Sequence, residues 1–217
     1  WELVIVLWAL IEQVCLRPDV ITYNSAMHAC KESCEWVAAL SFASLMRHNG
    51  IEPDVTTQSV CVGLCEDSKQ WPLSLHLLVE TQRASLRLTP GVITRSTAIS
   101  TCGKCSAWEH AAMVFASMRH ESVQPDVIAH SAITSACEKG RKWEASLDLV
   151  SEMLQRHLQP NNVTFSACIT ACEEYQHQGW MWALTLLANI CQHAQQLNSV
   201  AYCASISACE KDQQWAK

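Results

Sequence analysis

A repeat with a period of 35 to 37 residues constrains the fold of this chain more than any other feature of its 217 residues. Three residue types share the period and keep one order within it. The marker residues are Trp1, Trp36, Trp71, Trp108, Trp143, Trp180 and Trp215; Pro18, Pro53, Pro90, Pro125 and Pro160; and Cys30, Cys65, Cys102, Cys137, Cys172 and Cys209. Such a period is typical of repeat architectures, in which each repeat buries its apolar face against its neighbours.

Each repeat predicts two helices joined by a short turn. In residues 127–161, apolar side chains that include Ile133 and Cys137 recur at helical spacing, and Gly140 then interrupts the pattern. A second apolar stripe begins at Trp143. Strand-like alternation is not sustained in any segment. The sequence therefore predicts an all-α protein, a right-handed α-solenoid of helix-turn-helix repeats.

The spacing divides the chain into five complete repeats and two flanking halves. The complete repeats are 20–54, 55–91, 92–126, 127–161 and 162–198, and the halves are 1–19 and 199–217. Repeats 55–91 and 162–198 have 37 residues, with the extra residues expected between Trp71 and Pro90 and between Cys172 and Trp180. We expect Asp19, Asp54 and Asp126 to cap the helices that follow them.

The two ends of the sequence suggest a piece of a longer protein, because it starts at Trp1 and stops inside a predicted helix. Residues 3–11 are apolar throughout. That run is shorter than the roughly 20 residues that span a membrane, and acidic residues bracket it, so we expect a buried helix. Within these residues we expect no targeting segment.

Recurring words at fixed positions resemble the pentatricopeptide repeat, in its 35-residue P-type form. They are DVITYNSAMHACKE (19–32), DVIAHSAITSACEKGRKWEASLDLVSEM (126–153) and NVTFSACITACEE (162–174). The resemblance covers essentially the whole chain. It implies a modular binder of single-stranded RNA that takes about one nucleotide per repeat and has no catalytic residues, cofactor or metal.

The resemblance also implies which side chains meet the RNA. The fifth and last residues of a repeat read a base: Asn24 with Asp54, Ser59 with Gly91, Ser96 with Asp126, Ser131 with Asn161, and Ser166 with Asn198. The second residues clamp the base: Ile21, Thr56, Ile93, Ile128, Val163 and Val200. Five of these six are apolar and β-branched, and such side chains are rigid. The family's phosphate-facing lysine corresponds to Lys104, Lys139 and Lys211.

By the family's code, the five pairs resemble those for U, an undetermined base, G, A and A. Gly91 has no side chain, so repeat 55–91 is expected to act as a spacer. The resemblance implies a role in organellar RNA processing, stabilisation or translation, in a chloroplast or mitochondrion. It implies no membrane association and no small-molecule substrate, with protein partners possible on the convex face.

The repeated Cys and Trp allow chemical as well as structural interpretations. The thiols could bind a metal, but six of the 13 share one repeat position among apolar neighbours, which favours a core role. The Trp could stack on bases, but it opens the second helix, which favours packing. Arg95 and His130 replace a Tyr of the family, and we expect them to be neutral substitutions.

Net charge is the main objection to RNA binding, because it is −6 and RNA affinity depends on neutralised phosphates. The objection weakens if the acids lie on the second helices, where Glu144, Asp148 and Glu152 are expected. The alternative function is a protein-interaction scaffold that holds an extended peptide on its concave face.

Overall fold

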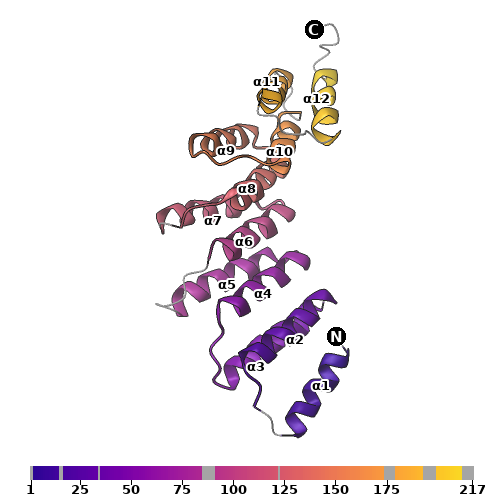
Figure 1. Cartoon of the computed structure of the whole chain (residues 1–217), viewed down its shortest axis with the longest axis vertical. Helices are drawn as coiled ribbons and strands as arrows, with labels where there is room; N and C mark the ends of the chain where they lie inside the picture. The colour runs from indigo at the N-terminus through magenta and orange to yellow at the C-terminus, as the bar shows by residue number, and fades with distance from the viewer. Residues whose placement is uncertain are drawn as a thin grey trace. The chain divides into compact units, whose positions relative to one another are not determined.

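The computed structural model describes residues 2–14, 17–33, 35–84, 91–121, 123–173, 179–192 and 199–211, which form twelve α-helices and no strand (Figure 1). The helices are α1 (Glu2–Gln13), α2 (Val20–Glu32), α3 (Trp36–His48), α4 (Val55–Asp67), α5 (Trp71–Ala84), α6 (Val92–Lys104), α7 (Trp108–His120), α8 (Val127–Lys139), α9 (Trp143–Gln155), α10 (Asn162–Glu173), α11 (Gly179–Gln192) and α12 (Ser199–Lys211). They confirm the predicted all-α helical-repeat class.

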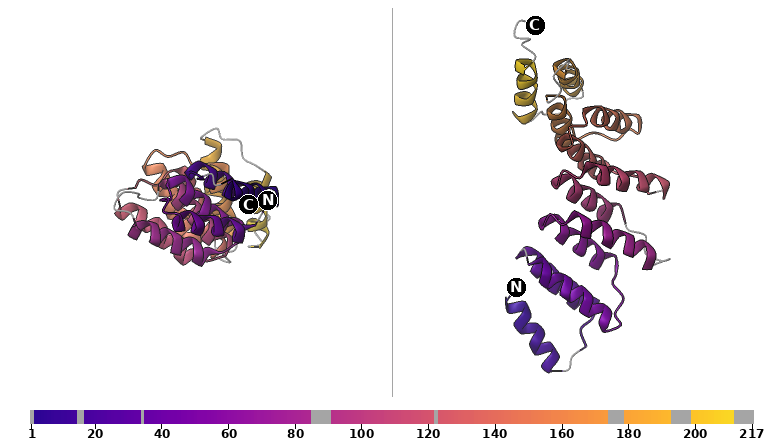
Figure 2. Two further views of the ribbon diagram at one scale, coloured as in Figure 1. Left: turned by 90° about the horizontal axis from the view of Figure 1, so that it is seen from below. Right: turned by 180° about the vertical axis from the view of Figure 1, so that it is seen from behind.

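Two compact units make up the chain, Trp1–Thr101 and Cys102–Lys217. In the first, α2 packs against α3, and α4 contacts α2, α3 and α5. Figures 1 and 2 show α2 and α3 side by side from opposite directions. In the second, α8 contacts α7, α9 and α10, and α10 contacts α9, α11 and α12. The first helices of successive repeats therefore touch: α2 with α4, α8 with α10, and α10 with α12.

The 37-residue repeats differ little from the others in the described residues. Helix α5 has 14 residues where α3, α7 and α9 have 13. The other extra residues, in 85–90 and 174–178, lie outside the described residues.

Aspartate caps start three of the first helices, as predicted. Asp19, Asp54 and Asp126 precede α2, α4 and α8 with extended backbone. Each carboxylate accepts a hydrogen bond at 2.7–2.9 Å from the backbone N–H three residues further on. These bonds satisfy N–H groups that the helix itself leaves without a partner.

The turn between the two helices of a repeat has a recurring left-handed residue. Lys69, Ser106 and Arg141 have φ between 55° and 58°. In the same turn, the Lys142 N–H donates to the carbonyl of Cys137 at 2.9 Å, and the two preceding turns form the equivalent bond. This is the Schellman arrangement that ends a helix. The repeated Cys thus also provides the carbonyl that closes its helix.

Gly140 directly follows the last residue of α8, where the apolar pattern is interrupted. Its φ is −81°, so the left-handed residue is Arg141 and the glycine is not needed for backbone freedom. A Cβ at Gly140 would lie 2.5 Å from Cγ of Trp108. The glycine is required because the indole of the preceding repeat packs directly on this turn.

The repeated Trp is partly buried at the start of each second helix, and Trp108 packs against the next repeat, which agrees with the structural interpretation. Trp36, Trp71, Trp108 and Trp143 are the first residues of α3, α5, α7 and α9, and all are half-buried. The Trp108 ring also lies 4.8 Å below the Lys142 ammonium, at cation–π distance. The indole therefore contacts the next repeat with both its edge and its face.

Helix α1 forms where predicted, but the prediction that it is buried is wrong. Trp8 is 7% exposed and packs on Tyr23 and Phe42, with ring centroids 4.7 and 4.8 Å away. Leu3 and Leu7 on the same helix are 77% and 58% exposed. An apolar run becomes buried only where neighbours cover it, and α1 contacts α2 along one stripe. None of the described helices has the length and apolarity needed to cross a membrane.

The repeated cysteines line the core, as predicted. Cys30, Cys65, Cys102, Cys137 and Cys172 are at most 2% exposed, and Cys209 is half-buried. Burial raises the pKa of the thiols of Cys102 and Cys137 to about 11, so both are neutral at pH 7. Within the described residues, His, Cys, Asp and Glu side chains nowhere gather in a group of three that could hold a metal ion. These thiols therefore behave as small apolar groups.

Candidate nucleic-acid interface

The first predicted reading pair forms a direct contact between two repeats. Asn24 Nδ2 donates to Asp54 Oδ1 at 3.2 Å and to Thr56 Oγ1 at 2.9 Å. The hydroxyl of Thr57 donates to Asn24 Oδ1 at 2.7 Å. The start of α4 therefore holds the fifth residue of repeat 20–54 through three side chains.

Asp54 carries a negative charge within this cluster. Partial burial raises the pKa of its carboxyl, but hydrogen bonds from Thr56, Thr57 and Asn24 outweigh burial and lower the pKa to about 2. At neutral pH the carboxylate is therefore an acceptor only. Its Oδ1 receives all the hydrogen bonds that the described residues make to this side chain, which leaves Oδ2 for a ligand.

A second predicted pair forms the same kind of contact in the other compact unit. The Ser131 hydroxyl on α8 lies 3.1 Å from Asn161 Oδ1 and 2.7 Å from Thr164 Oγ1. Thr164 in turn donates to Asn161 through its backbone N–H and its hydroxyl, both at 2.9 Å. Fifth and last residues therefore meet at the start of the next first helix in both compact units.

The pair of Ser59 and Gly91 has no such contact, because glycine has no side chain. Ser59 instead lies 2.9 Å from the hydroxyl of Thr94. A Cβ at Gly91 would meet no atom within 4 Å, so the position has room for a larger residue.

The two remaining pairs extend beyond what the structure describes within one unit. Ser96 is 3% exposed and donates to the carbonyl of Val92 at 2.8 Å, as Ser131 does to that of Val127, and its predicted partner Asp126 belongs to the other compact unit. Ser166 lies on α10, and its predicted partner Asn198 is outside the described residues.

The predicted clamp residues are large apolar side chains on the surface. Ile21, Ile93, Ile128 and Val163 are 57–72% exposed. Thr56 is exposed as well, and the side chain of Val200 lies outside the described residues. Exposed apolar side chains therefore recur at the second residue of the repeat.

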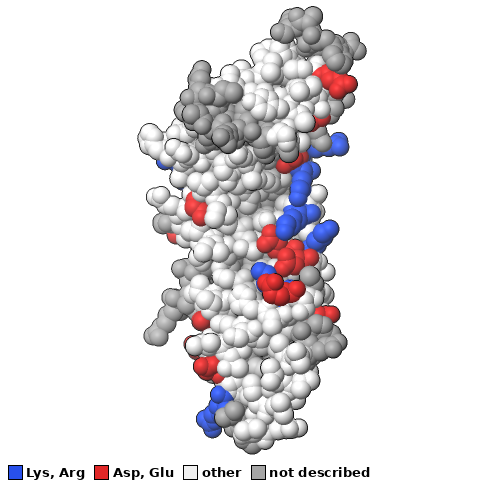
Figure 3. Space-filling model, turned by 45° about the vertical axis from the view of Figure 1, so that its right-hand side comes forward, with Lys and Arg blue, Asp and Glu red and all other residues white. Residues whose placement is uncertain are grey.

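Both kinds of helix carry charged residues of both signs, such as Glu66 on α4 and Arg47 on α3. The predicted phosphate-facing Lys104 and Lys139 are exposed at the C-terminal ends of α6 and α8, and Lys211 ends α12, with its side chain outside the described residues. Glu144 and Asp148 are exposed on α9, a second helix, as expected. Figure 3 shows one face of the molecule, where Lys, Arg, Asp and Glu form mixed groups on a mainly uncharged surface.

Ion pairs join successive second helices. Glu152 on α9 pairs with Arg119 on α7 and, at 2.9 Å, with Arg156, the residue that follows α9. Arg47 on α3 pairs with Glu80 on α5 at 3.5 Å. Arg47 and Arg119 occupy one position of their repeats, and Glu80 and Glu152 occupy another. Some of the acids are therefore neutralised locally, away from the reading pairs.

Arg95 and His130, which we expect to be neutral substitutions, are buried. They are 1% and 0% exposed. The His130 ring lies 5.1 Å from Phe115, edge to face, and its Nδ1 lies 2.9 Å from the carbonyl of Asp126.

The third residue of the repeat also takes part in these contacts and was not among the predicted site residues. Thr57, Thr94 and Thr164 are buried at 0–2% exposure, and each contacts the fifth residue of the preceding repeat. A signal for them was present, because Thr22 also occupies this position and the same register would have shown the series.

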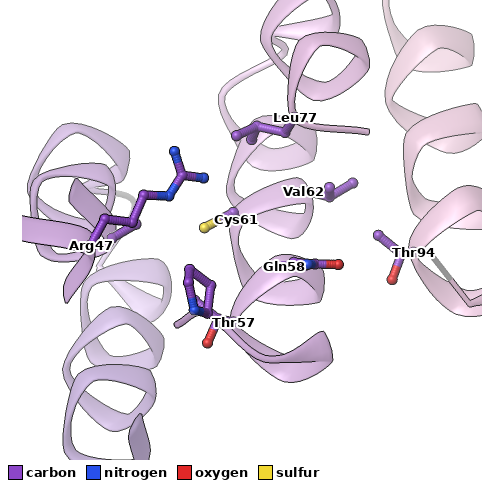
Figure 4. Close-up of a pocket in the computed structure, with 9 residues that line it drawn as sticks. Arg47, Thr57, Gln58, Cys61, Val62, Leu77 and Thr94 are labelled. Carbon is purple, nitrogen blue, oxygen red and sulfur yellow. The ribbon is translucent and has the colours of Figure 1, made fainter. Parts of the chain in front are cut away.

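A small cavity separates α3 from α4 in the first compact unit (Figure 4). The Gln58 side chain points toward Thr94, and the Cys61 sulfur points toward the helix that carries Arg47. The space open to water is about 20 Å³, enough for one molecule and too small for an organic ligand. Gln58 Oε1 is buried and has no hydrogen-bond partner among the described residues. Ala43 lines the cavity at the position that Trp8 and Phe115 fill in other repeats.

Stacked helix pairs with polar contacts between the fifth residue of one repeat and the start of the next define a helical-repeat protein of the kind that binds an extended polymer. Residues 18–66 match the model of the PPR repeat family, and residues 113–174 match that of the pentatricopeptide repeat domain. Together these stretches cover slightly more than half of the sequence. The chain belongs to the pentatricopeptide repeat family. A comparison with curated protein sequences gave no match.

Solved structures of the same fold agree with this assignment. The maize pentatricopeptide repeat protein PPR10 is 17% identical, with a TM-score of 0.69 over 95% of this chain and 29% of the maize chain. PPR10 in complex with an 18-nucleotide psaJ RNA element is 20% identical, with a TM-score of 0.73 over 91% of this chain and 28% of that chain. The PPR domain of Arabidopsis thaliana protein-only RNase P 1, in complex with tRNA, is 12% identical, with a TM-score of 0.67 over 88% of this chain and 96% of that domain. This chain thus spans less than a third of PPR10.

Proposed function

We propose that this protein binds single-stranded RNA in a sequence-specific manner, with about one nucleotide per repeat and without catalysing a reaction. The observation that carries the proposal is the recurring neighbourhood of an exposed β-branched side chain and a hydrogen-bonded polar pair. Ile21 precedes the pair of Asn24 and Asp54 on α2, and Ile128 precedes the pair of Ser131 and Asn161 on α8. A flat, polar-edged base suits such a site, because its face contacts the apolar group while its edge meets donors and acceptors.

Family membership supports the proposal, and so do the RNA-bound relatives of the same fold. The biological role that follows is RNA processing, stabilisation or translation in a chloroplast or mitochondrion, as is usual for the family. Lys104 and Lys139 supply cationic groups for the phosphates, while the ion pairs of α3, α5, α7 and α9 keep part of the acidic charge on the second helices.

Selection from a random RNA pool at low salt tests this function. We expect the enriched sequences to contain a motif compatible with U-N-G-A-A, where N is any base. Binding should weaken as salt rises, because phosphate contacts release counterions. If the chain fails to retain RNA even at low salt, the protein-scaffold alternative is favoured and the proposal is rejected.

A further inference from the structure

Three buried hydroxyl groups lie beneath the predicted base-reading side chains. They belong to the third residue of a repeat, and each contacts the fifth residue of the repeat before it. The contacts are Thr57 Oγ1 to Asn24 Oδ1 at 2.7 Å, Thr94 Oγ1 to Ser59 Oγ at 2.9 Å, and Thr164 Oγ1 to Ser131 Oγ at 2.7 Å. The same contact therefore recurs in three pairs of successive repeats.

The hydrogen bonds around Asn24 determine which way its amide points. Asp54 Oδ1 accepts from the Thr56 hydroxyl and the Thr57 backbone N–H, at 2.6 and 2.7 Å, and lies 3.2 Å from Asn24 Nδ2. Exchanging the oxygen and nitrogen of the amide would place two acceptors 3.2 Å apart, so Asp54 selects one orientation of the amide. The Thr57 hydroxyl lies 2.7 Å from both Asp54 Oδ1 and Asn24 Oδ1, so it bridges the two members of the reading pair and holds the amide oxygen in place.

This hydroxyl is not required for starting a helix. Helix α8 has Ala129 at the same position, and the Ala129 N–H donates to Asp126 Oδ1 at 2.8 Å, as at the other capped helices. At α8, capping therefore works through the backbone alone. At α4, the Thr57 hydroxyl also accepts from the Asp54 N–H at 3.3 Å, which completes a capping box, and it adds the contact with the preceding repeat.

We propose that Thr57 and Thr164 are positioning residues for base recognition, each fixing the reading side chain of the preceding repeat. Thr94 acts in the same way on Ser59. The inference rests on the proposed RNA binding and adds a third residue, supplied by the next repeat, to each base site. Because all three hydroxyls are buried, they orient the reading side chains without touching the base themselves.

Thr57→Val and Thr164→Val test the proposal, because valine keeps the shape and removes the hydroxyl. Affinity is measured for U-N-G-A-A and for RNAs changed at the first or the fourth base. Thr57→Val should lower discrimination at the first base roughly two- to tenfold, the value of one hydrogen bond, and leave the fourth unchanged. Thr164→Val should do the reverse. Thr57→Ser should restore discrimination.

Thr134→Val is the matched control. Thr134 is 0% exposed on α8, like Thr164 on α10, but its hydroxyl donates to the carbonyl of His130 at 2.8 Å within its own helix. Its replacement should affect thermal stability about as much as the other substitutions and leave base discrimination unchanged at every position.

Three outcomes separate this inference from the function on which it rests. Absence of RNA binding by the unaltered chain overturns the proposed function. Selective binding by the unaltered chain, with discrimination in both valine variants either unchanged or lowered equally at all bases, overturns the positioning role alone. A readout without RNA is the NMR signal of the Asn24 side-chain amide, whose hydrogen exchange should accelerate in Thr57→Val; an unchanged signal also contradicts the positioning role.

Discussion

The hydroxyl of Ser131 donates a hydrogen bond to Asn161 Oδ1 over 3.1 Å, although 30 residues separate the two in the chain. Asn24 and Asp54 are related in the same way at the same spacing. Since the members of a pair contact each other before any ligand binds, each pair should behave as one exchangeable unit of recognition.

Exchanging the residues of these two pairs should exchange their base preferences. Asn24→Ser combined with Asp54→Asn should shift the first base from U to A, by about tenfold in relative affinity. Ser131→Asn combined with Asn161→Asp should shift the fourth base from A to U. Binding to RNAs that carry each of the four bases at these positions measures both shifts, and unchanged preference in both double variants contradicts the assignment.

Two isoleucines of α8 should respond oppositely to truncation. Ile128 is 63% exposed, so Ile128→Ala should change the free energy of unfolding by less than about 0.5 kcal/mol yet weaken RNA binding several-fold. Ile133 is 2% exposed, so Ile133→Ala should cost about 2–5 kcal/mol of stability. Chemical denaturation and RNA titration of both variants separate the two effects. A stability loss at Ile128 comparable to that at Ile133 would refute its assignment to the ligand surface.

Gly91→Asp should give repeat 55–91, which is expected to act as a spacer, a preference for one base. The position has free space, and the carboxylate would cap α6 and face Ser59. The resulting pair has the residue types of Ser96 and Asp126, so we expect preference for G at the second base and a gain of a few tenths of a kcal/mol in stability. Gly91→Ala, which adds a Cβ without a carboxylate, is the control and should show neither effect.

Acidification should lower the stability of the native state because it protonates Asp54. Its carboxyl pKa of about 2 lies below the ordinary 3.8, so its ionised form stabilises the native state. That contribution is complete above about pH 4 and disappears as the pH falls toward 2. Because the side chain is partly exposed and solvent screens its interactions, we expect the ionised carboxylate to contribute about 1 kcal/mol to the free energy of unfolding. Denaturant unfolding between pH 7 and 2 should show Asp54→Asn less stable than the unaltered chain at neutral pH and equally stable near pH 2. A gap that persists at pH 2 would exclude this cause.

Gln58→Leu should stabilise the first compact unit. The substitution removes a buried carbonyl oxygen without a partner and fills the same volume with apolar atoms. We expect the free energy of unfolding to rise by about 1 kcal/mol, which corresponds to a rise of roughly 2–4 °C in melting temperature. Gln58→Glu places a carboxyl in the same site and should lower the melting temperature. A lower melting temperature for the leucine variant would show that the amide has a partner in solution.

The position of a residue within the repeat was sufficient to predict where helices begin and end. Cys137 and Trp143 mark where α8 ends and α9 begins, and Asp126 marks where α8 starts, because caps and turns depend on residues close together in the chain. The same logic correctly placed the repeated cysteines in the core. These features follow from side chains that act within one helical turn.

Features that depend on neighbouring elements could not be predicted in this way. The apolar run of α1 suggested burial, but coverage depends on which helices lie against it. Gly140 marks an interruption in the sequence pattern, but its role of admitting Trp108 from another repeat depends on a neighbouring helix. The contact of the Thr164 hydroxyl with Ser131 likewise joins two repeats and follows only from their packing.

The contact between Thr164 and Ser131 has a consequence for moving recognition sites between proteins of this kind. A segment cut at the sequence period, such as 127–161, leaves behind the hydroxyl that orients its reading side chain and accepts whatever third residue the recipient supplies. A segment running from Ser131 through Thr164 carries all three side chains together. The transplantable cassette for one nucleotide is therefore offset from the repeat that folds, and grafts cut to the offset boundaries should keep their base preference in a new host.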